Sequence, residues 1–265
     1  MVEGNGPDIT GASALLLAHW REGRHLDALP PPLRPATRAE GYAIQACAEA
    51  SSARPVRGWK IAATSAAGQA HINVDGPLAG RLFAERIVAE GDPVRLGANR
   101  MRVAEIEFVF RMGRGLPPRP DPYDVAEVMD AVAALHLGIE IPDSRFLNFT
   151  AVGAPQLIAD NACADQFVLG PEVTAPWGAR DLAAHAVQGR TARGTTHDGR
   201  GANVLGDPRI ALAWLANELG RHNTALGAGQ IVTTGTCVVP VPIGPGDVVT
   251  GDYGDFGSMQ VAFAA

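Results

Sequence analysis

The chain has 265 residues, of which 46% are hydrophobic and 19% are charged, and its net charge is −6. This composition is typical of a globular protein with a sizeable core, and it excludes a disordered chain or a coiled coil. The excess of acidic over basic residues argues against a nucleic-acid partner. No apolar stretch reaches the ~18 residues that a membrane-spanning helix needs, so we also expect no membrane partner.

The cysteines and the N-terminus indicate the compartment. Cys47, Cys163 and Cys237 are odd in number and lie far apart, which leaves neither a disulfide framework nor a CxxC metal site. The N-terminus lacks the basic segment and apolar run of a secretory signal peptide. The sequence therefore predicts a cytoplasmic protein with reduced thiols.

Two short helices are predicted near the N-terminus. Apolar residues between positions 15 and 26 indicate the first, and a capping box of Thr37 and Glu40 opens the second. Prolines between positions 30 and 35 make a stiff connector between them. We expect residues 1–55 to form an N-terminal helical segment packed on a core domain of residues 56–265.

The core domain is predicted to be rich in strands. Strand patterns cover residues 56–63, 103–112, 137–141, 166–169, 231–234, 248–252 and 259–263. Because the strands outnumber the helices and do not alternate regularly with them, we expect an α+β fold with a mixed, strongly bent β-sheet.

Three helices are predicted between these strands. Asp121 and the proline after it indicate a helix over 122–136, and residues 180–187 form a shorter candidate. Asp207 opens a helix over 208–219, which Gly220 would end.

Two glutamates stand inside the strand pattern of residues 103–112. Glu105 and Glu107 are two residues apart, so they share one face of the strand with their backbones ~6.6 Å apart. Two carboxylates at that spacing repel by ~2.5 kcal/mol at an effective dielectric constant near 20, and burial adds to this cost. The pair fits a solvent-exposed face, with Ile106 and Phe108 on the buried side, a divalent-cation site, or two carboxyl groups that share a proton.

A third glutamate favours the cation site. Glu140 also lies in an apolar, strand-like stretch. Three strand glutamates together with water would supply the oxygen-only, octahedral shell that magnesium or manganese prefers.

One lysine and one aspartate are further candidates. Lys60 stands inside a strand pattern with an apolar residue on each side. It fits either a surface lysine on a polar face or a partly desolvated lysine near a metal, whose lowered pKa would allow proton exchange near neutrality. Asp75 precedes Gly-Pro and is typical of a turn residue.

Several motifs together carry a resemblance to a known family. In chain order they are GWKI at 58–61, GRLF at 80–83, EIE at 105–107, IEIPDSR at 139–145, ADNA at 159–162, GANVLGDP at 201–208, AWLA at 213–216 and TGT at 234–236. From about Tyr42 to its C-terminus, the chain resembles the 2-keto-4-pentenoate hydratase and 4-oxalocrotonate decarboxylase group of the fumarylacetoacetate hydrolase superfamily. The set in this order is highly specific, whereas no single motif is.

This resemblance implies roles for individual residues. The family's E-x-E pair and a later glutamate bind magnesium or manganese, and its strand lysine and its aspartate before the Gly-x-Leu-Phe segment are catalytic. The implied set consists of the metal ligands Glu105, Glu107 and Glu140, the catalytic residues Lys60 and Asp75, and the substrate-binding residues Leu82 and Thr236.

The resemblance also implies a fold and an activity. The fold is a mixed β-roll of the fumarylacetoacetase C-terminal-domain type with flanking helices, formed by residues 56–265. The activity is that of a hydratase dependent on Mg²⁺ or Mn²⁺, which converts a 2-hydroxy-2,4-dienoate into a 4-hydroxy-2-oxo acid in the degradation of aromatic compounds. The partners are a small-molecule 2-oxo acid and further copies of the chain in a homo-oligomer, and a complex with a related decarboxylase or hydratase is compatible with it.

Three alternatives to the hydratase remain. A 4-oxalocrotonate-type decarboxylase would use the same site, because a metal chelate also stabilises the enolate left by loss of carbon dioxide. An acylpyruvate-type hydrolase is less expected, because hydrolase branches usually carry an aspartate as third ligand and an N-terminal His–Glu dyad. This chain has Glu140 and, near its N-terminus, only His19 and His25. A non-catalytic partner subunit would not need to retain Lys60 and the three glutamates.

Overall fold

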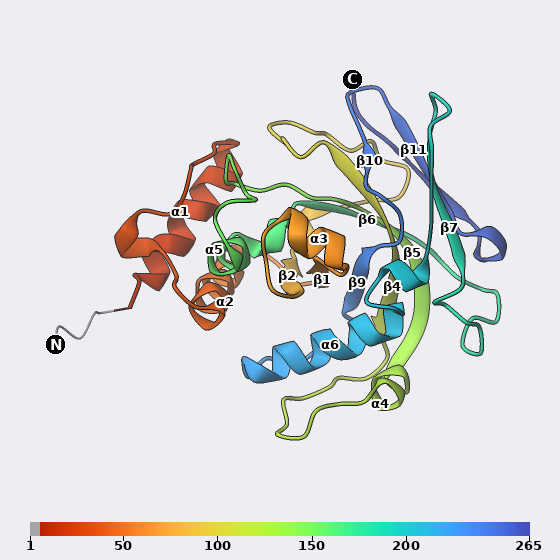
Figure 1. The fold of residues 1–265 in the computed structure, drawn as a ribbon, viewed down its shortest axis with the longest axis horizontal. Helices are drawn as coiled ribbons and strands as arrows, with labels where there is room; N and C mark the ends of the chain where they lie inside the picture. Colours follow the sequence, from red (N-terminus) through yellow and green to blue (C-terminus); the bar gives the residue numbers. More distant parts are fainter. Residues whose placement is uncertain (1–5) are drawn as a thin grey trace.

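The protein, a computed structural model that describes residues 6–265, is built around two β-sheets (Figure 1). In the larger sheet the strand order is β2-β1-β9-β4-β5-β6-β3, and β10 also pairs with β4. Its strands are β1 (Gly58–Ala62), β2 (Leu78–Leu82), β3 (Ile87–Val88), β4 (Val103–Met112), β5 (Val132–Ile141), β6 (Gln166–Glu172), β9 (Ile231–Thr236) and β10 (Val241–Pro242). β1 runs parallel to β9, as β3 does to β6, whereas the other pairs are antiparallel. The predicted mixed sheet is therefore confirmed, and Figure 1 shows it curling around its core.

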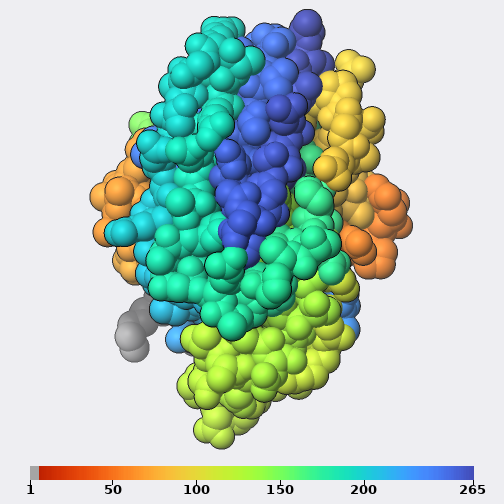
Figure 2. All heavy atoms as spheres, turned by 90° about the vertical axis from the view of Figure 1, so that its right-hand side faces the viewer, coloured from red at the N-terminus to blue at the C-terminus, as the bar shows by residue number. Residues whose placement is uncertain are grey.

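The smaller sheet is antiparallel, with the order β12-β11-β7-β8. Its strands are β7 (Ala186–Thr191), β8 (Thr196–Arg200), β11 (Val248–Asp252) and β12 (Ser258–Ala262). In Figure 2 these strands lie side by side, in teal and blue, on one face of the molecule. The sheet packs closely on β4, because a Cβ added at Gly189 or Gly251 would lie within 3.2 Å of the Ile106 side chain.

The helices flank the sheets. They are α1 (Ile9–Glu22), α2 (Arg38–Cys47), α3 (Ala66–His71), α4 (Val125–Met129), α5 (Ala154–Ala159) and α6 (Pro208–Arg221). α1, α2 and α5 gather at one end of the molecule (Figure 1), and α6 packs against α4 and β9. Within residues 6–265, none of the helices has both the length and the apolar character needed to cross a membrane.

The N-terminal helices have clear local signals. α2 begins at the predicted capping box, in which Thr37 and Glu40 bond each other's main chain. Ala12 and Leu16 of α1 pack with Ile44 of α2 in an apolar cluster separate from the main core. The division of the chain into 1–55 and 56–265 remains a prediction, and residues 1–5 of the first part lie outside the described residues.

One predicted helix is too long, and another is not formed. Asp124 rather than Asp121 caps the first, which is only α4, and residues 132–141 then form β5 instead of continuing it. Pairing of β5 with both β4 and β6 outweighs the local helix propensity of its alanines and leucines. Over 180–187 the Asp181 carboxylate accepts a hydrogen bond from the Ala184 amide, which makes a turn, and β7 follows.

Other predictions are confirmed closely. β4 and β11 have the predicted bounds, and α6 begins at the predicted cap Asp207. α6 continues through Gly220 to Arg221, two residues before the left-handed Asn223. The patterns did not indicate β2, β3, β7, β8, β10, α3 or α5, which are short.

Tyr253, directly after β11, joins the two sheets. Its side chain is fully buried, and its hydroxyl lies 2.8 Å from the Glu107 carbonyl oxygen and 3.0 Å from the Gly138 carbonyl oxygen. These two acceptors belong to paired positions of β4 and β5. The hydroxyl therefore fixes the segment after β11 to the centre of the larger sheet.

We expect Tyr253→Phe to lower the free energy of unfolding by about 1–3 kcal/mol, because it removes the donor from two buried carbonyl groups. Tyr123→Phe is the matched control, since the Tyr123 hydroxyl donates to the Pro117 carbonyl in an exposed setting and its loss should cost less than about 0.5 kcal/mol. Urea denaturation measures both. Equal losses in the two variants would contradict the role given to Tyr253.

Candidate metal centre and active site

Three glutamates meet in the interior of the larger sheet. Alternation along β4 places Glu105 and Glu107 on one face, and the register of β5 places Glu140 directly opposite Glu105. Glu107 pairs with Gly138 across the two strands, and this glycine has no side chain that could occupy the space beside the Glu107 side chain. One carboxylate oxygen from each glutamate lies within 4.8 Å of the other two. The β4–β5 register therefore creates the predicted cluster.

The cluster is buried, so the interpretation as a solvent-exposed face is wrong. Glu107 and Glu140 are fully buried and Glu105 is partly exposed. Ile106 and Phe108, on the other face of β4, are fully buried as well. The strand is covered on both sides because the smaller sheet packs over the face opposite the glutamates.

Hydrogen bonds from β9 orient Glu107. The Thr233 hydroxyl and the Gly235 amide, the latter at 2.7 Å, both donate to Oε2 of Glu107. Gly235 has a φ of +104°, and an added Cβ there would lie 2.1 Å from the Thr64 hydroxyl oxygen, so this position requires glycine. Oε1 of Glu107 is left without a partner.

Burial and mutual repulsion make these carboxyl groups hard to ionise. Burial, together with the charges of Glu140 and Glu105, raises the pKa of Glu107 well above its usual range. Burial raises the pKa of Glu140 to about 7, although the ammonium of Lys60 opposes the shift. A divalent cation would remove this cost, because it binds the ionised carboxylates.

The donor atoms fit a hard divalent cation. Oε1 of Glu107 and Oε2 of Glu140 are buried without a partner, and Oε1 of Glu140 accepts no hydrogen bond and is paired only with the Lys60 ammonium, 3.1 Å away. Buried polar atoms normally have partners, so an unpaired set that points to one place calls for an explanation. All the donors are carboxylate oxygens, which suits Mg²⁺ or Mn²⁺ rather than a softer metal.

Lys60 lies against this cluster rather than on the surface. It is the only lysine in the sequence, and it is 2% exposed. Its Nζ lies 3.1 Å from Oε1 of Glu140 and donates a hydrogen bond of 3.1 Å to the Ala162 carbonyl. Burial alone would lower the pKa of Lys60, but the charges of Glu140 and Glu105 outweigh it and hold the pKa above its ordinary value. The lowered pKa considered from the sequence is therefore not what this geometry favours.

The turn that contacts Lys60 is strained. Asn161, Ala162 and Cys163 have φ values of 56°, 51° and 61°. The left-handed conformation costs about 1–2 kcal/mol for an ordinary residue, whereas asparagine tolerates it better.

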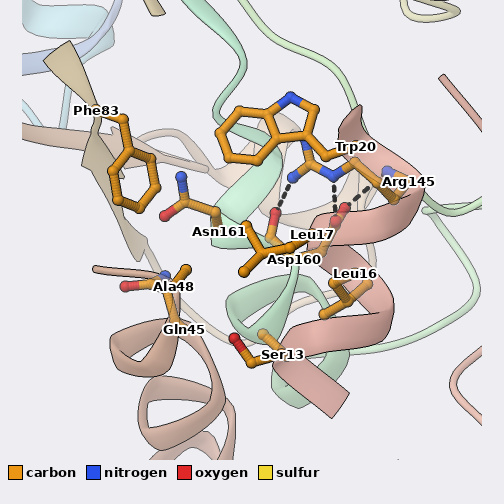
Figure 3. A pocket seen from close by; sticks show the side chains of 11 residues that line it. Ser13, Leu16, Leu17, Trp20, Gln45, Ala48, Phe83, Arg145, Asp160 and Asn161 are labelled. Carbon is orange, nitrogen blue, oxygen red and sulfur yellow. Dashed lines mark hydrogen bonds and ion pairs between the residues drawn. The ribbon is translucent and has the colours of Figure 1, made fainter. Parts of the chain in front are cut away.

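Burial raises the pKa of the Cys163 thiol to about 12, so this group is a neutral thiol and not a nucleophilic thiolate. Figure 3 shows Asp160 and Asn161 at the start of this turn, beside α1 and α2.

The other predicted site residues are placed differently. The Asp75 side chain is 82% exposed and forms an ion pair with Arg38 of α2, so its carboxylate does not join the cluster. Leu82 is buried at the end of β2, and Thr236 lies opposite Glu107 at the end of β9. The roles predicted for Asp75, Leu82 and Thr236 remain predictions.

His19 and His25 line a separate cleft of about 330 Å³ beside α1. His25 Nε2 lies 4.0 Å from a carboxylate oxygen of Asp143, which lines the same cleft. Within residues 6–265 none of the three clustered glutamates lines it. These histidines therefore do not form a dyad with the glutamate cluster.

Sequence reasoning missed the residues that support the ligands. The run Thr-Thr-Gly-Thr at 233–236 completes β9 after two apolar residues, and this pattern could have indicated the hydrogen bonds from Thr233 and Gly235. The contact of Ala162 with Lys60 had no signal, because every residue has a carbonyl group.

We expect Glu107→Gln to weaken binding of Mg²⁺ or Mn²⁺ at least tenfold, because it removes an anionic ligand. The variant should unfold at the same or a higher temperature in the absence of cation, since it relieves repulsion inside the cluster. Calorimetric titration and thermal unfolding measure the two effects. Glu172→Gln is the matched control, because Glu172 lies at the surface; unchanged affinity in Glu107→Gln would refute the metal assignment.

Comparisons with known proteins identify relatives of this chain. The chain is 33% identical over 256 residues to 2-keto-4-pentenoate hydratase 1 of Dechloromonas aromatica (strain RCB), covering 96% of each chain. It is 35% identical over 202 residues to 2-hydroxyhexa-2,4-dienoate hydratase of Comamonas testosteroni, covering 75% of this chain and 74% of the relative.

Among solved structures, the chain is similar to 4-oxalocrotonate decarboxylase from Pseudomonas putida G7 complexed with magnesium and adipate. The TM-score is 0.85 at 26% identity, with 96% of this chain and 97% of the other covered. The model of the fumarylacetoacetate (FAA) hydrolase C-terminal family matches residues 47–264. The chain therefore belongs to the fumarylacetoacetate hydrolase C-terminal family.

Proposed function

We propose that this protein is a divalent-metal-dependent hydratase, which adds water to a 2-hydroxy-2,4-dienoate and gives a 4-hydroxy-2-oxo acid in the degradation of aromatic compounds. The observation that carries the proposal is the buried cluster of Glu105, Glu107 and Glu140, with unpaired carboxylate oxygens beside the only lysine. The prediction of a hydro-lyase is confirmed by hydratase relatives that match nearly the whole chain.

The proposed cofactor is Mg²⁺ or Mn²⁺, held by the three glutamates. Structures of 4-oxalocrotonate decarboxylase complexed with magnesium and with calcium support a divalent cation in this fold. When bound, the cation would supply Lewis-acid stabilisation of the negative charge that develops on the 2-oxygen of the substrate.

Three side chains have separate proposed roles in the reaction. Lys60 is an ammonium held between the Ala162 carbonyl and the Glu140 carboxylate, which suits it to stabilise negative charge that develops on the substrate. It would donate its proton to the substrate carbon skeleton once a bound cation neutralises the glutamates that raise its pKa. Glu105 is the most exposed of the three glutamates, so the substrate would approach from its side. Asp75 could exchange a proton at C3 or C5, or orient the water for C4, only if its turn moves inward, because its carboxylate faces solvent.

We expect Lys60→Met to lower kcat about 10²–10⁴-fold, the usual contribution of a proton-transferring group, while cation binding persists. Lys60→Arg is the matched control, because arginine retains the positive charge and stays protonated. Steady-state hydration assays and calorimetry with Mn²⁺ measure the two effects. Normal turnover in Lys60→Met would remove this lysine from the mechanism, and full rescue by Lys60→Arg would leave it an electrostatic role only.

Decarboxylation of a 4-oxalocrotonate-type substrate is the second candidate. The similarity to 4-oxalocrotonate decarboxylase over nearly the whole chain favours it specifically. The same chelate would stabilise the enolate left by loss of carbon dioxide, so the metal cluster alone does not separate the two reactions.

Product analysis distinguishes these two functions. The purified chain is given a 2-hydroxy-2,4-dienoate and, separately, its 6-carboxylated analogue, in each case with Mg²⁺ or Mn²⁺. We expect a 4-hydroxy-2-oxo acid from the dienoate and no metal-dependent release of carbon dioxide from the analogue. Carbon dioxide release without hydration would replace the proposed function by the decarboxylase.

The remaining alternatives have less support. Glu140 stands where hydrolase branches of the superfamily usually have aspartate, and His19 and His25 line another cleft. A non-catalytic subunit would be excluded by turnover of the purified chain alone, abolished by a chelator and restored by Mg²⁺. We also propose that the protein is a cytoplasmic homo-oligomer that can associate with a related decarboxylase or hydratase, as the family resemblance suggests. Light scattering of the purified chain tests the self-association.

A further inference from the structure

The turn after α5 makes a direct contact with the amine of Lys60. We propose that Asn161 is a positioning residue. Its side chain holds the left-handed turn of residues 161–163 against β2, and this turn fixes the Lys60 amine beside Glu140. The kinetic test of this proposal rests on the proposed function. The position of the Lys60 amine can be measured without it.

The conformation of the turn is imposed by its surroundings. Asn161, Ala162 and Cys163 are, within residues 6–265, the only consecutive non-glycine residues with positive φ. Ala162 and Cys163 gain nothing locally from this conformation, because neither has the short polar side chain that stabilises it in asparagine. Strained segments of this kind persist where neighbouring groups hold them, and they gather at functional sites.

Arg145 holds the two ends of the turn. Its guanidinium donates to the carboxylate and to the main-chain oxygen of Asp160, as Figure 3 shows, and to the Ala164 carbonyl at 3.1 Å. The Asp160 carboxylate also accepts a hydrogen bond of 2.7 Å from the Ser144 hydroxyl. Arg145 and Asp160 are buried, so solvent does not weaken this clamp.

Asn161 holds the turn to the strand beside Lys60. Its Oδ1 accepts from the Arg81 amide at 2.7 Å, and its Nδ2 donates to the Arg81 carbonyl at 2.9 Å. The neighbouring Gly80 pairs with Lys60 across β1 and β2. A Cβ at Gly80 would lie 2.4 Å from the Asn161 carbonyl oxygen and 3.0 Å from Cγ of Lys60. The turn and the stem of the lysine therefore share the space above Gly80.

The clamped turn directs the Ala162 carbonyl at the amine. Nζ of Lys60 lies 3.1 Å from this oxygen, to which it donates a hydrogen bond, and 3.1 Å from Oε1 of Glu140, with which it forms an ion pair, so it is held between the two. Without the Asn161 carboxamide, the turn can relax toward ordinary φ values and its carbonyl leaves the amine. Lys60 would then be held by the glutamates alone and would lose the position from which it serves the substrate.

Two substitutions at Asn161 test this inference kinetically. Asn161→Gly removes the side-chain hydrogen bonds to β2 but keeps a residue that accepts positive φ. Asn161→Ala removes these hydrogen bonds and also the tolerance of positive φ. We expect each to lower kcat for dienoate hydration at least tenfold, with KM and Mn²⁺ affinity changed less than threefold. Asn223→Ala is the matched control, because Asn223 is also left-handed, with a φ of 52°, but follows α6 and is exposed. Unchanged kcat in both Asn161 variants would overturn the proposal.

The single lysine allows a direct measurement that does not depend on the reaction. Protein labelled with [ζ-¹⁵N]lysine gives one side-chain ammonium signal, that of Lys60. We expect Asn161→Gly to shift this signal and to speed its hydrogen exchange with water, and Asn223→Ala to leave both unchanged. A signal that stays as in the unsubstituted protein would refute positioning through Lys60, even if kcat falls. If the unsubstituted protein fails to hydrate dienoates, the proposed function fails while this measurement still decides the positioning.

Discussion

The placement of three carboxylates around one point in the protein interior governs the rest of the structure. Oxygen atoms within 4.8 Å of one another repel by at least about 3 kcal/mol per pair at an effective dielectric constant near 20. The single ammonium of Lys60, 3.1 Å from Glu140, offsets about 5 kcal/mol on the same scale. One lysine cannot balance three ionised glutamates. The cluster therefore either holds protons, as the raised pKa values of Glu107 and Glu140 indicate, or binds a cation.

The fold withstands this repulsion because main-chain hydrogen bonds fix the glutamates. Glu105 and Glu140 face each other in the β4–β5 ladder, and β9 supplies the donors that turn Glu107. The smaller sheet covers the opposite face of β4, where Tyr253 bonds to the carbonyls of Glu107 and Gly138. A ligand set on adjacent central strands is rigid before any cation binds, so little ordering remains to oppose binding.

The sequence predicted the chemistry of the site better than its surroundings. The E-x-E spacing on a strand predicted Glu105 and Glu107 on one face, and β4 has the predicted bounds. The same reasoning did not decide whether that face was exposed, because alternation is identical for a buried face and a solvent-exposed one. It also extended a helix through residues 132–136, where alanine and leucine favour helix locally but pairing on both edges makes β5. For Asp75 it indicated a turn and a resemblance to a catalytic aspartate, whereas the carboxylate lies exposed against Arg38.

The amino-acid sequence by itself determined the family, the mixed α+β class and the identity of the acidic residues, because these depend on residue type, local spacing and motif order. Only the tertiary structure decided that Glu140 lies opposite Glu105, that Lys60 is buried between Glu140 and a carbonyl oxygen, and that this carbonyl belongs to the left-handed turn at Ala162. Strand register and main-chain direction bring together residues far apart in the chain. No local pattern encodes them, since they result from pairing that involves the whole sheet.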